Sequence, residues 1–196
     1  MAFSPDAIRS MLAGRQTRTV AEWDARPAAV LLPLFNAGGR WNLLFTERTQ
    51  DVADHKGQVA FPGGRADAAD ASRVETALRE AEEEIGLRRG DVAVLGTLDE
   101  LLTVTQYRVT PVLGVFPWPY EFEANPIEID SVFHAPLNWL ADPANLEIQY
   151  REPPFGGPPI PVYYYYYQGH TIWGVTARIL VTFLEIAGLR PASPAT

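Results

Sequence analysis

A helix crowded with acidic side chains, over residues 75–85, constrains this chain more than any other feature. The segment is rich in Ala, Leu, Arg and Glu, which favour helices, and Gly86 is a typical helix terminus. Side chains three or four residues apart share one helix face, so Glu80, Glu83 and Glu84 present three carboxylates to one place. Like charges at this spacing repel one another, and a compensating cation is therefore expected.

Mg²⁺ or Mn²⁺ would compensate this face, because hard cations prefer carboxylate oxygens. Arg79 could neutralise part of the cluster and hold its orientation. Gly63 and Gly64 stand ahead of the helix, and glycine lets a backbone carbonyl approach a metal closely. The alternative is a solvated acidic helix surface, which the helix alone would favour. The glycine turn ahead of it favours a metal site instead.

The same segment closely resembles the Nudix box, whose pattern is G-x5-E-x7-R-E-U-x-E-E-x-G-U, with U an aliphatic residue. Gly64 begins the match here, and the run from Arg79 to Leu87 reads R-E-A-E-E-E-I-G-L. Asp70 stands where the family usually has Glu, and its shorter side chain is expected to reach less far. Eight residues rather than seven separate Asp70 from Arg79, so the loop carries one extra residue.

This resemblance implies an α+β Nudix fold, an α/β/α sandwich around a mixed β-sheet. It implies that metal ions activate a water for attack on a diphosphate. A carboxylate accepts the proton of that water; Glu83 or Glu84 is the candidate, although a glutamate elsewhere could serve. Glu128 is expected to be a loop acid near the metals rather than the base. Arg79 would be structural, pairing with a carboxylate of the box. The implied catalytic and metal-site residues are Arg79, Glu80, Glu83, Glu84, Gly63 and Gly64.

A second motif, over residues 101–114, narrows the substrate. It resembles the L-L-T-x5-V-x-P-x-x-G signature of coenzyme A pyrophosphatases within the Nudix family. The run 55–64, the extra loop residue and the segment 172–178 are similar to that branch too, and together these features cover most of residues 28–187. The implied reaction cleaves coenzyme A or its derivatives into 3′,5′-ADP and 4′-phosphopantetheine. By periodicity alone, the motif is a loop followed by an edge strand, because Pro111 disfavours a central position.

Two other functions remain open. A Nudix hydrolase could act on another nucleoside diphosphate derivative, such as ADP-ribose, NADH or a dinucleoside polyphosphate. A non-catalytic Nudix-fold ligand sensor is the third possibility, but a sensor has no need to keep Glu80, Glu83 and Glu84 together.

Coenzyme A carries a 3′-phosphate and a diphosphate, so cationic or hydrogen-bonding partners are expected. The substrate-binding candidates are Arg48, His55, Lys56, Gln58, Arg65 and Arg108. Lys56, the only lysine in the chain, and Arg65 flank the glycine turn and rank above the others. A solvated surface position is the alternative for the arginines, and a structural role is the alternative for His55.

Length and composition predict one domain over residues 1–196, with a core at about 28–187, a short helix over 5–13 and a flexible tail over 189–196. The net charge of −8 argues against a nucleic-acid surface. Cysteine is absent, which excludes disulfides and thiolate chemistry. Neither a signal peptide nor an apolar stretch of membrane-spanning length is found, so we expect a cytoplasmic protein, monomeric or homodimeric, whose partner is a small-molecule substrate.

Several further elements are predicted. Apolar runs at 28–35 and 41–47 around a glycine-containing turn predict a hairpin, and Pro33 indicates an edge or a bulge. Five prolines in 151–161 predict a loop. Strands are expected over 92–98, 107–116, 127–133 and 163–167, and helices over 135–140 and 175–187.

Overall fold

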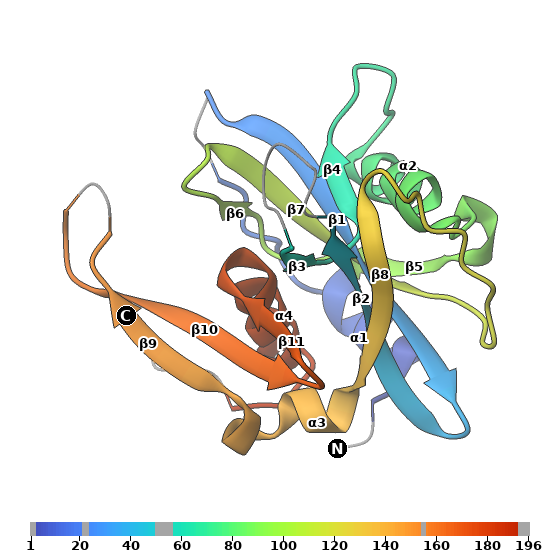
Figure 1. Cartoon of the computed structure of the whole chain (residues 1–196). Coiled ribbons are helices and arrows are strands. Elements are labelled where there is room, and N and C mark those ends of the chain that lie inside the picture. Colours follow the sequence, from blue (N-terminus) through green and yellow to red (C-terminus); the bar gives the residue numbers. More distant parts are fainter. Residues whose placement is uncertain (1–2, 21–23, 50–56, 154–155, 192–196) are drawn as a thin grey trace.

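The computed structural model describes residues 3–20, 24–49, 57–153 and 156–191 (Figure 1). A mixed β-sheet has helix α2 (Arg73–Ile85) on one face, and α1 (Pro5–Ala13) and α4 (Gly174–Ile186) on the other. Within these residues, no helix is both long enough and apolar enough to span a membrane. The arrangement is an α/β/α sandwich of the α+β class.

Eight strands of the described residues form the main sheet, with β3-β2-β1-β7-β5 as its backbone order. Their bounds are β1 (Arg26–Ala37), β2 (Arg40–Arg48), β3 (Val59–Ala60), β4 (Gly63–Arg65), β5 (Ala93–Thr97), β6 (Leu101–Leu102), β7 (Tyr107–Val115) and β8 (Ile129–Pro136). Strands β1 and β7 are parallel, and the other pairs are antiparallel. β4 pairs with β1, β6 with β7, and β8 with β2.

A second sheet, ordered β11-β10-β9, packs against α4. Its strands are β9 (Glu147–Arg151), β10 (Ile160–Tyr167) and β11 (His170–Trp173). The remaining elements are the helix α3 (Leu137–Ala141) and two short 3₁₀ turns, Arg89–Asp91 and Pro143–Asn145. The loop expected over 151–161 is shorter than predicted, because Arg151 pairs with Ile160 and extends both strands into the proline-rich segment.

The two prolines expected at sheet edges lie in central strands instead. Strand β1 lies between β2 and β7, and β7 lies between β1 and β5, so the edge prediction for Pro33 and Pro111 is wrong. Each proline sits where the antiparallel partner of its strand changes. Along β1, pairing with β4 reaches Val30 and pairing with β2 starts at Leu34. Along β7, pairing with β6 reaches Val109 and pairing with β5 starts at Val112. A residue without an N–H is better tolerated at such an interruption of the antiparallel pairing than within a continuous ladder.

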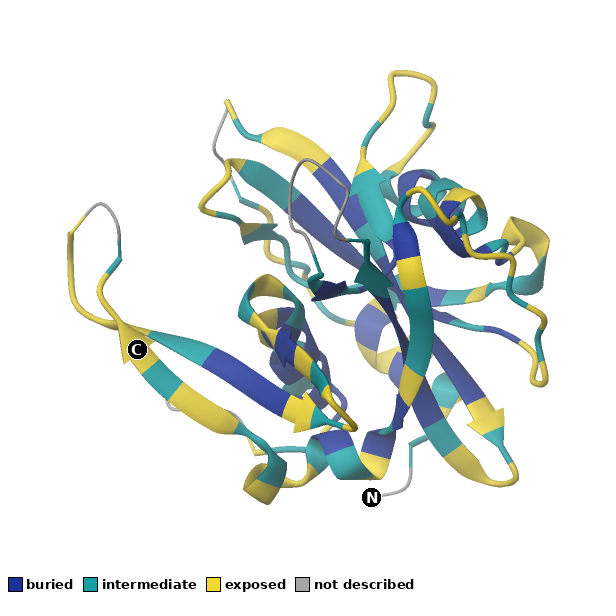
Figure 2. Ribbon diagram, in the orientation of Figure 1, coloured by how far each residue is buried: buried dark blue, intermediate teal, exposed yellow. Residues whose placement is uncertain are grey.

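Alternating side chains of β1 divide the core into two layers. Leu32 and Leu34 join the cluster that contains α1 and α4, whereas Leu31 and Phe35 join the cluster beneath α2. Figure 2 shows the buried residues along the central strands and many exposed residues on the β9–β10 hairpin. Burying one such side chain contributes about 1.5–3 kcal/mol, so these layers fix α2 firmly on the sheet.

Candidate metal-dependent active site

Helix α2 is held at both ends by local capping. The Ser72 side chain accepts a hydrogen bond from the Glu75 N–H at 3.2 Å, and Gly86 ends the helix in a left-handed conformation with φ 69°. Ala77, Ala81 and other apolar side chains pack on the sheet. The carboxylates of α2 therefore project from a helix that is held firmly in place on the sheet.

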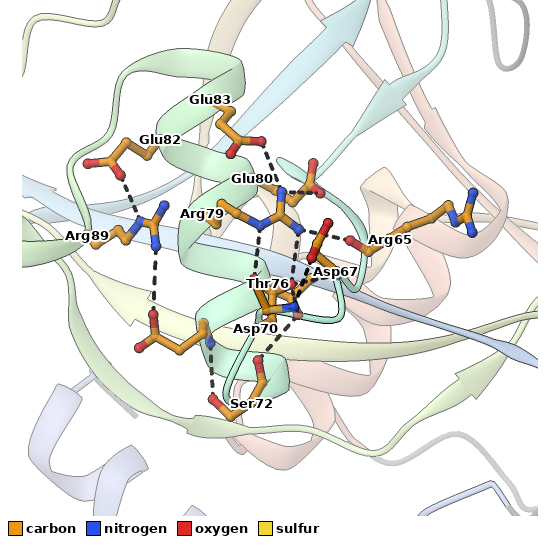
Figure 3. Close-up of polar contacts among 12 residues, drawn as sticks. Arg65, Asp67, Asp70, Ser72, Thr76, Arg79, Glu80, Glu82, Glu83 and Arg89 are labelled. Atoms are coloured by element: carbon orange, nitrogen blue, oxygen red, sulfur yellow. Dashed lines mark hydrogen bonds and ion pairs between the residues drawn. The ribbon is translucent and has the colours of Figure 1, made fainter.

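Asp70 and Arg79 form a two-bond ion pair between α2 and the loop that precedes it (Figure 3). Arg79 donates from Nε to Oδ1 at 3.0 Å and from Nη2 to Oδ2 at 3.1 Å. The Asp67 N–H and the Thr76 hydroxyl also donate to Oδ2, each at 2.8 Å. These bonds, with Arg79 first, hold the pKa of Asp70 well below its usual range. Although its side chain is shorter than that of glutamate, Asp70 reaches Arg79 with both carboxylate oxygens.

Arg79 also forms ion pairs with two of the predicted metal ligands. Its Nη1 lies 2.8 Å from Glu80 Oε1 and 2.9 Å from Glu83 Oε2. Its Nη2 donates to the carbonyl of Arg65 at 3.0 Å. The pairing with Asp70, and then with Glu80, raises the pKa of Arg79, while burial raises the pKa of Glu80. The Arg79 guanidinium thus connects the loop before α2 with the carboxylates on α2.

Glu84 is the most enclosed of the three glutamates, with only 5% of its side chain exposed. Its Oε2 accepts a hydrogen bond from the Gly63 N–H at 3.1 Å, and its Oε1 lies 3.5 Å from Arg48 Nη1. Burial raises the pKa of Glu84 to about 8, although the Gly63 N–H and Arg48 oppose the change. A buried carboxylate with so few partners favours a further cation at this place.

The glycine turn in β4 brings the backbone directly against these side chains. A Cβ on Gly64 would collide with the carboxylate of Glu80, whereas a Cβ on Gly63 would lie 2.6 Å from Val30 Cα. Glycine is thus required at both positions, but for different reasons. The missing side chain at position 64 leaves room for the Glu80 carboxylate, and the missing side chain at position 63 leaves room for the backbone of β1.

This difference predicts opposite outcomes for two alanine variants. Gly63→Ala should destabilise the fold by about 2–3 kcal/mol, because the backbone of β1 cannot yield to the added methyl group. Gly64→Ala should leave the melting temperature nearly unchanged but remove most activity, because the flexible Glu80 side chain must move aside. Thermal unfolding and turnover of the two purified variants check this, and equal destabilisation by both would contradict it.

The structure places only some of the predicted substrate-binding residues near the glutamates. Arg48 lies at the glutamates, and its backbone N–H donates to the Gln58 carbonyl at 3.1 Å. Figure 3 shows the guanidinium of Arg65 extending away from Arg79, into an exposed position. Arg108 lies elsewhere, 3.9 Å from Glu100 and 3.4 Å from the Val20 carbonyl. His55 and Lys56 fall outside the described residues.

Two other residues at the site were harder to predict from the sequence. Thr76, which binds Asp70, lies three residues before Arg79 and so shares its helix face, a signal that the sequence contained. Glu128 lies 4.0 Å from Arg48, at the end of a loop whose Asn125 N–H donates to the Glu84 carbonyl at 2.8 Å. This loop contact depends on tertiary structure and has no local sequence signal.

The comparisons with known proteins decide the family. The model of the NUDIX domain matches residues 25–151. The chain belongs to the Nudix family. An uncharacterized Nudix hydrolase NudL of Photorhabdus laumondii is 42% identical over 158 residues, covering 79% of this chain and 81% of the relative. The protein of the same name in Escherichia coli K12 is 38% identical over 169 residues, covering 85% of each.

Solved structures support the fold. The Nudix hydrolase RenU of M. smegmatis has a TM-score of 0.51 at 22% identity, over 64% of this chain and 81% of its own. A MutT/nudix family protein from Enterococcus faecalis has a TM-score of 0.52 at 13% identity, over 94% and 70%. The predicted Nudix fold is therefore confirmed, and the protein is a Nudix hydrolase acting on nucleoside diphosphate derivatives.

Nudix hydrolases generally use divalent metal ions, and the residues present fit such an ion. Among the described residues, no three carboxylate or imidazole groups are already arranged as a ligand set, and Glu80 and Glu83 pair with Arg79. The donors are nevertheless all oxygens, which suit Mg²⁺ or Mn²⁺. The Glu80 carboxylate packed against Gly64, and the buried Glu84, support the same conclusion.

Proposed function

We propose that this protein hydrolyses the diphosphate of coenzyme A or its derivatives, giving 3′,5′-ADP and (acyl-)4′-phosphopantetheine, with Mg²⁺ or Mn²⁺. The supporting observation is the position of the 101–114 motif. Ala28 of β1 pairs with Val109 of this motif on one side and with Arg65 of the glycine turn on the other. Two strand spacings of about 4.8 Å each separate the two motifs, so one substrate can contact both.

The roles of the residues follow from their positions. Glu80, Glu83 and Glu84, with the carbonyl of Gly63 or Gly64, would hold the metal. A bound divalent ion neutralises phosphate oxygens and makes water a better nucleophile. Arg79 and its partner Asp70 keep the glutamates and the glycine turn in register.

The proton acceptor is one of two glutamates. The Glu83 side chain is 57% exposed and can meet a water from solvent, whereas the Glu84 side chain is only 5% exposed. Glu83 is therefore the better placed base, and Glu84 the better placed ligand. Arg48, nearest the glutamates, is the residue we assign first to a substrate phosphate. Gln58 and Arg65, with His55 and Lys56, complete the set near the glycine turn, and Arg108, beside Glu100, would contact a more distant part of the substrate.

We further propose a single cytoplasmic domain spanning residues 1–196. We propose a small-molecule substrate as its partner, with neither nucleic acid nor a membrane. The oligomeric state, monomer or homodimer, is decided by sedimentation velocity.

A substrate panel tests the reaction. Coenzyme A, acetyl-CoA, ADP-ribose, NADH and a dinucleoside tetraphosphate are each incubated with the protein and Mn²⁺, and the products are identified by mass spectrometry. We expect 3′,5′-ADP from the first two at the highest kcat/KM, and loss of turnover in EDTA that Mn²⁺ restores. Higher kcat/KM for ADP-ribose or NADH would favour the other diphosphatase function, and binding without any product would favour the sensor. Water labelled with ¹⁸O identifies the phosphorus that is attacked.

A further inference from the structure

Arg48, the last residue of β2, is held between two carboxylates without a hydrogen bond to either. Its Nη1 lies 3.5 Å from Glu84 Oε1, and its Nη2 lies 4.0 Å from Glu128 Oε2. Its Nε is buried and has no hydrogen-bond partner among the described residues. A guanidinium offers five donors in a planar fork that matches phosphate oxygens. Arg48 is therefore attracted to Glu84 by charge, but its donors are not satisfied there.

The two oxygens of Glu84 are not equivalent. Oε2 accepts the Gly63 N–H at 3.1 Å, which ties that oxygen to the glycine turn. Oε1 has no such bond and faces Arg48. Oε1 is the more open oxygen for a divalent cation, because Oε2 already accepts the Gly63 N–H. Arg48 and the cation thus compete for one oxygen atom.

We propose that Arg48 is a displaceable counter-ion of Glu84, which yields the carboxylate to the divalent cation and then binds a phosphate oxygen of the substrate. This inference rests on the proposed metal site and adds an exchange of partners to it. Glu128 keeps the guanidinium over the site during the exchange, because it contacts the other terminal nitrogen. The Arg48 guanidinium, released from Glu84, then neutralises a phosphate of the substrate.

The exchange has a thermodynamic signature. Two positive charges beside one carboxylate repel each other, so Arg48 must weaken cation binding. The coupling is reciprocal, and the bound cation must equally weaken the hold of Glu84 on Arg48. Removing the guanidinium charge should therefore act in opposite directions on the two ligands: the cation binds more tightly, and the diphosphate binds less tightly. General damage to the site would weaken both.

Cation binding is the first measurement. Free Mn²⁺ is followed by electron paramagnetic resonance at pH 8, without substrate, for the wild type, Arg48→Gln, Arg48→Met and Arg48→Lys. The two neutral variants should bind Mn²⁺ about tenfold more tightly, whereas Arg48→Lys should stay within about twofold of the wild type because it keeps the charge. Two neutral side chains are used so that poor folding of one, seen in its melting curve, leaves the other as the test.

Diphosphate binding is the second measurement. At saturating Mn²⁺, the affinity for methylenediphosphonate, a diphosphate that cannot be hydrolysed, should fall about tenfold in the neutral variants and less in Arg48→Lys. Unchanged or weaker Mn²⁺ binding by both neutral variants would overturn the inference, as would unchanged affinity for the diphosphonate. If the wild type binds Mn²⁺ and cleaves coenzyme A, such a result leaves the proposed function intact. A wild type that binds no Mn²⁺ refutes the proposed metal site and the inference with it.

Discussion

Glu84→Gln should lower kcat/KM for the diphosphate substrate by roughly 10³-fold, the size of effect expected when one strongly placed charge at a reacting centre is lost. Glutamine keeps the shape of the side chain and an oxygen that can accept the Gly63 N–H. It removes the negative charge that would bind the cation. Glu83→Gln should cause a loss of the same order, through the cation or through the proton of the attacking water.

The stability of Glu84→Gln should be equal to or higher than that of the wild type. Burial raises the pKa of Glu84 to about 8, because the enclosed site disfavours the charged form of the side chain. A neutral amide avoids that cost. Lost activity with an unchanged or raised melting temperature would separate a catalytic role from a structural one.

Glu82→Gln is the matched control on the same helix. Glu82 faces away from Glu80 and Glu84 and pairs with Arg89, whose Nε lies 2.7 Å from its Oε2. Both side chains are partly exposed, and such pairs contribute little stability. We expect kcat/KM within about twofold of the wild type, because exposed pairs of this kind rarely influence a distant centre. A Glu84→Gln enzyme as active as Glu82→Gln would show that the proposed site is wrong.

The sequence predicted the parts of the site that depend on local periodicity. Glu80, Glu83 and Glu84 share a face because helix geometry repeats every 3.6 residues, and Gly86 ends α2 as expected. The partner of Glu84 in β2 was not predictable in the same way. Arg48 reaches it only because the β1–β2 hairpin places the end of β2 beside the helix, which depends on the register of the sheet.

Strand order was the other limit of the sequence. Pro33 and Pro111 predict edges when each strand is considered alone, yet both lie in central strands. Near Pro33 the antiparallel partner of β1 changes from β4 to β2, and near Pro111 the antiparallel partner of β7 changes from β6 to β5. For β1 the change brings in β4, which is far along the chain from it, and for β7 it involves two different strands, β5 and β6. The residue pattern of a single strand reports neither change.

Asp70→Asn should destabilise the fold by about 2–3 kcal/mol, because it leaves the Arg79 guanidinium without its main counter-charge. The carboxylate is 5% exposed and accepts four hydrogen bonds, two of them from Arg79. An amide nitrogen in place of one oxygen would face a donor. The pair lies near the surface, so we place the loss below the range for a deeply buried pair. Activity should fall as well, since Arg79 orients Glu80 and Glu83.

The same variant should change how stability depends on pH. Since the folded protein lowers the pKa of Asp70 below its unfolded value of about 3.9, the pair stabilises the fold fully above that pH. Its contribution is lost as the pH falls through the folded pKa. The difference in unfolding free energy between wild type and Asp70→Asn should therefore be constant near neutrality and shrink below about pH 4. Urea unfolding at a series of pH values measures it.

Asp6→Asn is the control for this prediction, because it makes the same chemical change in an exposed ion pair. The Asp6 side chain is 92% exposed and lies 3.0 Å from Arg9. Water screens that pair, so its loss should cost at most about 0.5 kcal/mol. Equal losses for the two variants, or a difference from wild type at position 70 that does not shrink in acid, would mean that the Asp70 carboxylate does not hold Arg79 through its charge.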